Sequence, residues 1–171
     1  LFNQLSDFFG GTKKSGVPDN PGLIESPPDY RDIPLSSIQS LDNFPEEYHI
    51  PYKIKVSDQN GYPHCVAHAG RAMKIEKERR EQNYDVDFDT VWLYNECKKI
   101  DGHPELRGTY FRALFKVLQK KGAKPLNGSE ADAEKYRIGG YARIEPLTFN
   151  TIKASIYKHG IAILGFEGSN A

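Results

Sequence analysis

Cys65 lies where a predicted helix begins, a position from which a cysteine can act as a nucleophile. The helix dipole and the free N–H groups of a first turn favour the thiolate form of such a cysteine. Gln59, six residues earlier, could donate its side-chain amide to an oxyanion alongside the backbone N–H of Cys65. Asn60, Gly61 and Pro63 are typical of a tight turn, which would fold this amide back over the thiol. The pair is suited to acyl transfer through a covalent intermediate.

The segment from Asp58 to Ala69, with the sequence DQNGYPHCVAHA, resembles the active-site segment of papain-like cysteine peptidases. In that family a Gln stands six residues before the nucleophile, and small residues follow the nucleophile in the helix. The segment from Phe88 to Cys97 is similar to the family's second helix, and the segment from Arg107 to Leu114 is similar to its substrate wall and third helix. The resemblance covers about residues 45–171.

This resemblance implies an α+β fold, with the helical half largely present and followed by the start of the β half. It implies that Cys65 is the nucleophile, that Gln59 completes the oxyanion hole, and that Gly108 and Thr109 bind an extended substrate backbone. A plainer interpretation makes Thr109 the cap of the following helix. The function so implied is that of a peptidase C1-type thiol protease, an endopeptidase that hydrolyses proteins or peptides.

The chain departs from the family pattern in two respects. The first cysteine of the signature Cys-Gly-Ser/Ala-Cys-Trp/Tyr is missing, and with it a disulfide, as in disulfide-poor bacterial or phage members. The catalytic His and Asn are expected about 130–150 residues after the nucleophile, hence beyond Ala171. We therefore expect the 171-residue chain alone to be inactive. The alternative is a catalytically silent papain-like module with a structural or assembly role.

The other cysteine and the histidines allow competing interpretations. His64, Cys65 and His68 could be taken for a metal site, but three ligands around one helical turn point in awkward directions, so neither a metal nor a cofactor is predicted. His68 is better explained as a packed or supporting residue, and His159 as a structural residue before a turn. Cys97 is expected to be a packed residue on a helix and not to form a disulfide with Cys65, since such a disulfide would consume the nucleophile.

Hydrophobic spacing predicts the elements that would position these groups. Apolar or small residues at positions 66, 69, 70 and 73 follow one face of a helix over 65–82. Its opposite face is predicted to be solvated and to carry three i,i+4 ion pairs: Lys74 with Glu78, Glu76 with Arg80, and Lys77 with Glu81. Further helices are predicted over 89–99, 109–121 and 148–158, with short strands over 141–144 and 161–166.

The first 44 residues differ from the rest in composition and in the spacing of apolar residues. Residues 1–9 have the apolar stripe of a short helix, for which we expect a protein partner. Residues 10–34 are rich in Gly and Pro and are predicted to form an extended arm without regular secondary structure. We therefore divide the chain into an N-terminal segment and arm, 1–44, and a peptidase domain, 45–171.

The composition narrows the classes of partner. The 23 basic and 23 acidic residues give a formal net charge of +0, which favours neither nucleic acid nor an anionic membrane. The longest apolar run, over 161–164, is far shorter than the roughly 20 residues that cross a bilayer. Two cysteines cannot form a dense disulfide framework, which favours a reducing compartment such as the cytoplasm or a virion. The resemblance to papain-like cysteine peptidases implies that the partner is a protein or peptide substrate.

Overall fold

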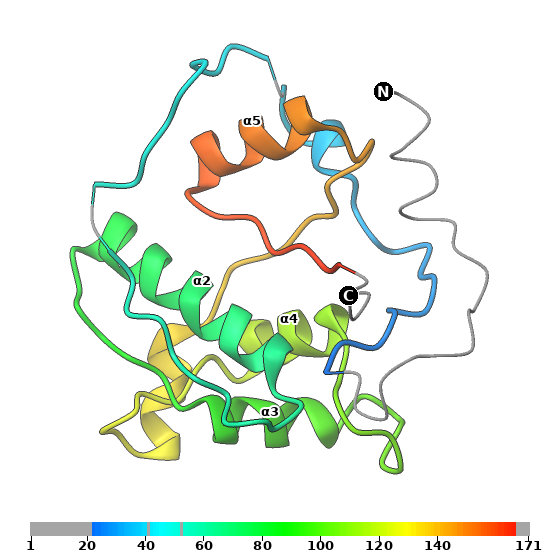
Figure 1. Cartoon of the computed structure of the whole chain (residues 1–171), viewed down its shortest axis with the longest axis vertical. Coiled ribbons are helices and arrows are strands. Elements are labelled where there is room, and N and C mark those ends of the chain that lie inside the picture. Colours follow the sequence, from blue (N-terminus) through cyan, green and yellow to red (C-terminus); the bar gives the residue numbers. More distant parts are fainter. Residues whose placement is uncertain (1–21, 41, 52, 167–171) are drawn as a thin grey trace.

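The computed structural model describes residues 22–40, 42–51 and 53–166 (Figure 1). Helices account for all of the regular secondary structure in these residues. The α-helices are α2 (Cys65–Gln82), α3 (Thr90–Lys98), α4 (Phe111–Lys120) and α5 (Phe149–His159), and the 3-10 helices are η1 (Leu35–Ser37) and η2 (Glu130–Tyr136). None of the described helices is long and apolar enough to cross a membrane.

The hydrophobic core lies where α2, α3 and α4 pack against one another. Val66 of α2, Leu93 of α3, and Leu114 and Leu118 of α4 are all buried there. Gly70 lets α2 approach α4 closely, because a Cβ at this position would lie 2.6 Å from a methyl carbon of Leu114. On the apolar face predicted from the spacing in 65–82, Val66, Gly70 and Met73 are buried and Ala69 is partly buried.

The opposite face of α2 corrects a prediction. Lys74 and Glu76 are only 2% and 1% exposed, although this face was expected to be solvated. The end of α5 covers Glu76, whose carboxylate lies against Gly160, where a Cβ would be 2.1 Å from Oε1. Lys74 is placed differently, with its ammonium 5.9 Å from the centre of the Phe88 ring. Arg80 donates hydrogen bonds to two carbonyl groups in the last turn of α5, where a cation is favoured by the helix dipole. The predicted pairs Lys74–Glu78 and Lys77–Glu81 do form.

The helix ends follow local capping. Asp89 caps α3 by accepting a 2.9 Å hydrogen bond from the N–H of Trp92, and Thr148 forms a capping box with Thr151 at the start of α5. Helix α4 begins two residues later than predicted, with Tyr110 as its N-cap. The interpretation of Thr109 as the helix cap is therefore wrong. Helix η2 was not predicted, although its Ser129 and Asp132 form a capping box.

The two predicted strands are absent from the described part of the chain. Residues 141–144 and 161–166 lie in irregular backbone, and the first of these segments makes one isolated parallel bridge, between Arg143 and Pro34. A strand exists only when a neighbouring strand takes up its N–H and C=O groups. The described residues offer no continuous partner, so the start of a β half is not formed in them.

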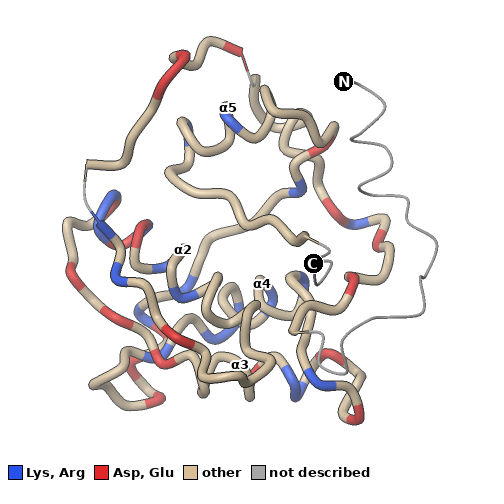
Figure 2. The backbone as a smooth tube through the Cα atoms, viewed as in Figure 1, with Lys and Arg blue, Asp and Glu red and all other residues tan. Residues whose placement is uncertain are grey.

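The arm has no helix or strand within residues 22–34, as predicted. The segments 1–9 and 10–21 of the sequence-based predictions lie outside the described residues, and the domain boundary near residue 44 stays a prediction. Basic and acidic residues are interspersed along the described backbone (Figure 2), in keeping with a net charge of +0.

Candidate active site

Cys65 is the first residue of α2 and follows His64 as N-cap. Its thiol is free and partly buried. The preceding turn is built from two consecutive residues with left-handed backbone, Asn60 and Gly61, and Asp58 accepts a 2.8 Å hydrogen bond from the N–H of Asn60. The structure thus confirms the predicted tight turn and the helix start at the cysteine.

Gln59 lies at the beginning of this turn, where its carbonyl accepts a 2.9 Å hydrogen bond from the N–H of Tyr62. Its side chain is exposed to solvent. Gln59 thus lies in the loop that leads into α2 at Cys65. Its donation to an oxyanion stays a prediction.

The N-terminal arm passes directly over the thiol. A Cβ built on Gly22 would lie 2.6 Å from Cys65 Sγ, so the space between arm and thiol admits only a glycine. Beside the thiol the arm pairs with Thr109: the Thr109 N–H donates to the Gly22 carbonyl at 3.2 Å, and the Ile24 N–H donates to the Thr109 carbonyl at 2.9 Å. Leu23 sits between these two bonds, in a parallel bridge with Thr109. A segment of peptide backbone therefore occupies the surface formed by Cys65 and Thr109.

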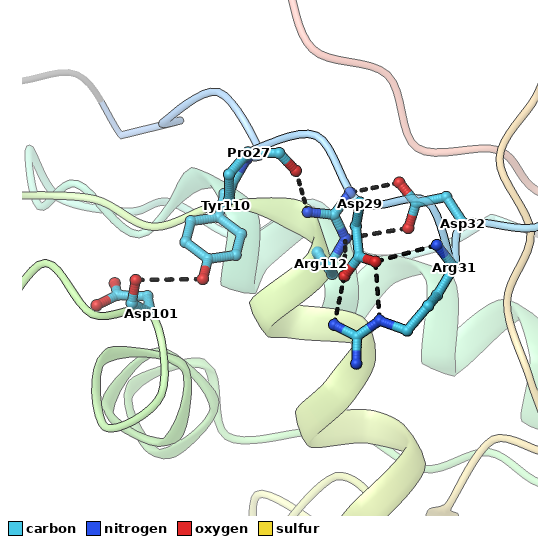
Figure 3. Close-up of polar contacts among 7 residues, drawn as sticks. All are labelled: Pro27, Asp29, Arg31, Asp32, Asp101, Tyr110 and Arg112. Carbon is cyan, nitrogen blue, oxygen red and sulfur yellow. Dashed lines mark hydrogen bonds and ion pairs between the residues drawn. The ribbon is translucent and has the colours of Figure 1, made fainter.

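Arg112 of α4 fastens the arm a few residues further on (Figure 3). Its guanidinium donates to both carboxylate oxygens of Asp32 and to the carbonyl of Pro27. Arg112 is 8% exposed, so this is a buried charge with a matched partner. Next to it, Arg31 donates to Asp29 within the arm and holds the pKa of that carboxyl well below its usual range.

Gly108 and Thr109, the predicted substrate wall, are both buried. Gly108 has φ 93, a backbone conformation that glycine adopts without strain. Tyr94 and Lys98 of α3 hold it, through the Tyr94 hydroxyl at 3.3 Å from the Gly108 N–H nitrogen and the Lys98 ammonium at 3.1 Å from the Gly108 carbonyl oxygen. Sequence reasoning missed Gly22, Tyr94, Lys98 and Arg112, because nothing local marks a contact between segments so far apart.

The electrostatics of the two thiols differ. Burial raises the pKa of Cys65, and the backbone N–H groups of Val66 and Cys65 oppose this shift without overcoming it. Burial and the nearby carboxylates of Asp101 and Glu96 raise the pKa of Cys97 to about 12. In this conformation the net result is a pKa of Cys65 above its usual value, contrary to the simple expectation from its position at a helix start.

The histidines near the site have other partners. The His64 ring packs between the rings of Tyr62 and Tyr94, with centroids at 5.5 and 4.0 Å. His68 Nδ1 lies 2.6 Å from Ser57 Oγ, which ties α2 to the loop before the turn. His159 ends α5 and contacts Gln39 at 2.8 Å, in line with its predicted structural role. Among the described residues no three His, Cys, Asp or Glu side chains gather into a potential metal site.

Neither a scan against protein-family models nor a search of curated proteins gives a match for this sequence. Among solved structures, the chain is similar to the crystal structure of xylellain, a cysteine protease from Xylella fastidiosa, with a TM-score of 0.66 and 23% sequence identity. The match covers 86% of this chain and 66% of the xylellain chain, just under two thirds of that structure. The likeness supports the papain-like fold predicted from the sequence.

Proposed function

We propose that the protein is a cysteine endopeptidase in which the Cys65 thiolate attacks a peptide carbonyl. The observation that carries the proposal is the occupied site: an extended peptide segment, 22–24, pairs with the backbone of Thr109 and passes against Cys65 Sγ. A surface that holds one peptide backbone beside a thiol at a helix start can hold a substrate in the same way. The structural likeness to a cysteine protease adds to this.

In the proposed reaction, substrate backbone replaces the arm along Gly108 and Thr109. The Cys65 N–H and the Gln59 side-chain amide stabilise the oxyanion of the tetrahedral intermediate. A histidine and an asparagine that follow Ala171 in the complete protein supply the base and its orienting partner. Turnover requires the arm to leave, because a Gly22 backbone in contact with Sγ blocks the approach of a carbonyl carbon.

The test uses the complete product of the gene and a Gly22→Ala variant. The new methyl group would lie 2.6 Å from Cys65 Sγ and must push the arm off the thiol. We expect the variant to hydrolyse peptides and to react with a peptidyl vinyl sulfone several-fold faster than the unmodified protein. Gly139→Ala is the matched control, because a Cβ there meets nothing within 4 Å.

Cys65→Ala should abolish both reactions, whereas Cys97→Ala should leave them unchanged. If Gly22→Ala frees the thiol for small alkylating agents but neither hydrolysis nor labelling by the peptidyl reagent follows, the endopeptidase proposal is wrong. That result would instead favour the catalytically silent module.

A further inference from the structure

We infer that Lys98 is a positioning residue for the substrate, because it fixes the direction in which the Thr109 N–H points. The inference rests on the proposed peptidase function, in which the backbone of Thr109 binds the substrate. Lys98 is the last residue of α3, and the loop that follows it leads to Gly108. The Lys98 side chain is only 17% exposed, whereas most lysine side chains in proteins are exposed to solvent.

The Lys98 ammonium binds three backbone carbonyl groups of this loop. Its nitrogen lies 2.6 Å from the carbonyl oxygen of His103, 2.9 Å from that of Leu106 and 3.1 Å from that of Gly108. These three carbonyls use all three N–H donors of an ammonium group. The fully buried carboxylate of Asp101, 2.8 Å away, therefore acts as a counter-charge and not as a fourth hydrogen-bond acceptor.

Asp101 is itself held in place. Its Oδ1 accepts a 3.0 Å hydrogen bond from the N–H of His103, and its backbone carbonyl accepts a 3.2 Å hydrogen bond from the hydroxyl of Tyr110 (Figure 3). Tyr110 is the N-cap of α4. The loop is thus fixed from α3 through Lys98 and from α4 through Tyr110, and both anchors lie on the helical core.

The geometry of one peptide unit connects Lys98 to the substrate wall. The Gly108 carbonyl and the Thr109 N–H belong to the same trans peptide, so they point in opposite directions. Because Lys98 turns the Gly108 carbonyl toward α3, the Thr109 N–H must face away from α3, where it meets the arm at the Gly22 carbonyl. Tyr94, one turn before Lys98 on the same face of α3, holds the Gly108 N–H in the same way.

The test measures hydrogen exchange of single backbone amides in the chain with its arm, which requires no catalysis. In Lys98→Met, the amides of Thr109 and Ile24 should lose protection by about tenfold or more, the scale of a hydrogen bond to a charged group. The amides of Leu114 and Leu118 in α4 report on the core and should be unchanged. Lys98→Arg keeps the charge and several donors, and should restore most of the protection.

Two further variants separate positioning from general destabilisation. Lys98→Met leaves the buried Asp101 carboxylate without its counter-charge. The double variant Lys98→Met, Asp101→Asn removes that charge as well, so it can be tested if the single variant unfolds. Tyr94→Phe removes only the hydroxyl that holds the Gly108 N–H, and should expose the same two amides to a smaller degree. Lys99→Met is the matched control, since Lys99 is 64% exposed and pairs with Glu96 away from the loop carbonyls.

In the active form of the protein, Lys98→Met should raise KM for extended peptides several-fold with a smaller change in kcat. With the arm displaced, alkylation of Cys65 by iodoacetamide, which needs no wall, should keep its rate. Unchanged protection of the Thr109 and Ile24 amides in Lys98→Met, with and without Asp101→Asn, would overturn the inference, whether or not the protein proves to be a peptidase. Absence of peptidase activity with the expected loss of protection would instead contradict the proposed function alone.

Discussion

At the thiol of Cys65 two effects act on the pKa in opposite directions. The N–H groups of the first turn of α2 stabilise the thiolate, and burial beneath the arm destabilises it. Burial is the larger effect in this conformation, so the pKa lies above that of a free cysteine. The reactivity of the Cys65 thiol is therefore linked to the position of the arm: each step that exposes Sγ to water lowers its pKa and frees the approach to the sulfur.

Cys65 should react with iodoacetamide faster than Cys97 at pH 7.5. Cys97 has no exposed surface and a pKa of about 12, so almost none of it is thiolate. The Cys65 rate should rise as the pH rises, because its pKa also lies above the usual value. Mass spectrometry of the labelled peptides measures both rates in one sample. Equal rates in the folded protein would contradict the difference in burial and pKa between the two thiols.

At the scale of elements, the arm is held against the helical core by backbone pairing and by one buried cation. Backbone pairing at Thr109 fixes residues 22–24 over the thiol. Arg112 then binds Asp32 and Pro27, and a parallel bridge joins Pro34 to Arg143. Since Arg112 reaches the arm from the first turn of α4, this helix supports both the arm and the proposed substrate wall that precedes it.

Arg112→Met should loosen the arm without unfolding the core. The change leaves the Asp32 carboxylate, 17% exposed, without its partner, at a cost of about 3 kcal/mol. We expect faster proteolysis within residues 25–33, followed by mass spectrometry, together with faster alkylation of Cys65. Arg31→Met is the control: Arg31 is 67% exposed and pairs with Asp29 inside the arm, so it should change little. The same cleavage rate in both variants would show that Arg112 does not fasten the arm.

At the scale of the whole molecule, three histidines with a lowered pKa link stability to pH: His64 and His68 are partly buried, and His159 is more exposed. Burial lowers the pKa of His64, His68 and His159 below the usual 6.5. Neighbouring positive charges lower it further, with Arg71 acting on His68 and several basic residues acting on His159. These side chains therefore bind protons more readily in the unfolded chain than in the folded one, and acid favours unfolding.

The free energy of unfolding should fall as the pH is lowered from about 6.5 to 5, the window in which unfolded histidines become protonated. Urea denaturation at a series of pH values measures this slope. His159→Gln should make the slope shallower, because one of the three groups is removed. His49→Gln, at an exposed position, serves as control and should leave the slope unchanged. A flat profile over this window would contradict the link between these histidines and stability.

The sequence by itself determined the local features of the helical half. The start of α2 at Cys65, the tight turn after Gln59 and the buried apolar face of α2 follow from spacing, capping and turn residues that act within a few positions of one another. The absence of regular structure in 22–34 follows equally from local Pro and Gly content. Each of these features depends on interactions between residues close together in the chain, so a sequence pattern can predict it.

Only the tertiary structure decided the features that join distant segments. Three such contacts depend on which surfaces meet in three dimensions. Gly22 lies against Cys65 Sγ, Lys98 donates a hydrogen bond to the Gly108 carbonyl, and Glu76 is buried beneath the end of α5. The predicted strand over 161–166 did not form among the described residues for the same reason, since a strand needs a partner elsewhere in the chain. Such contacts are chosen by the packing of the whole core, and no local spacing encodes them.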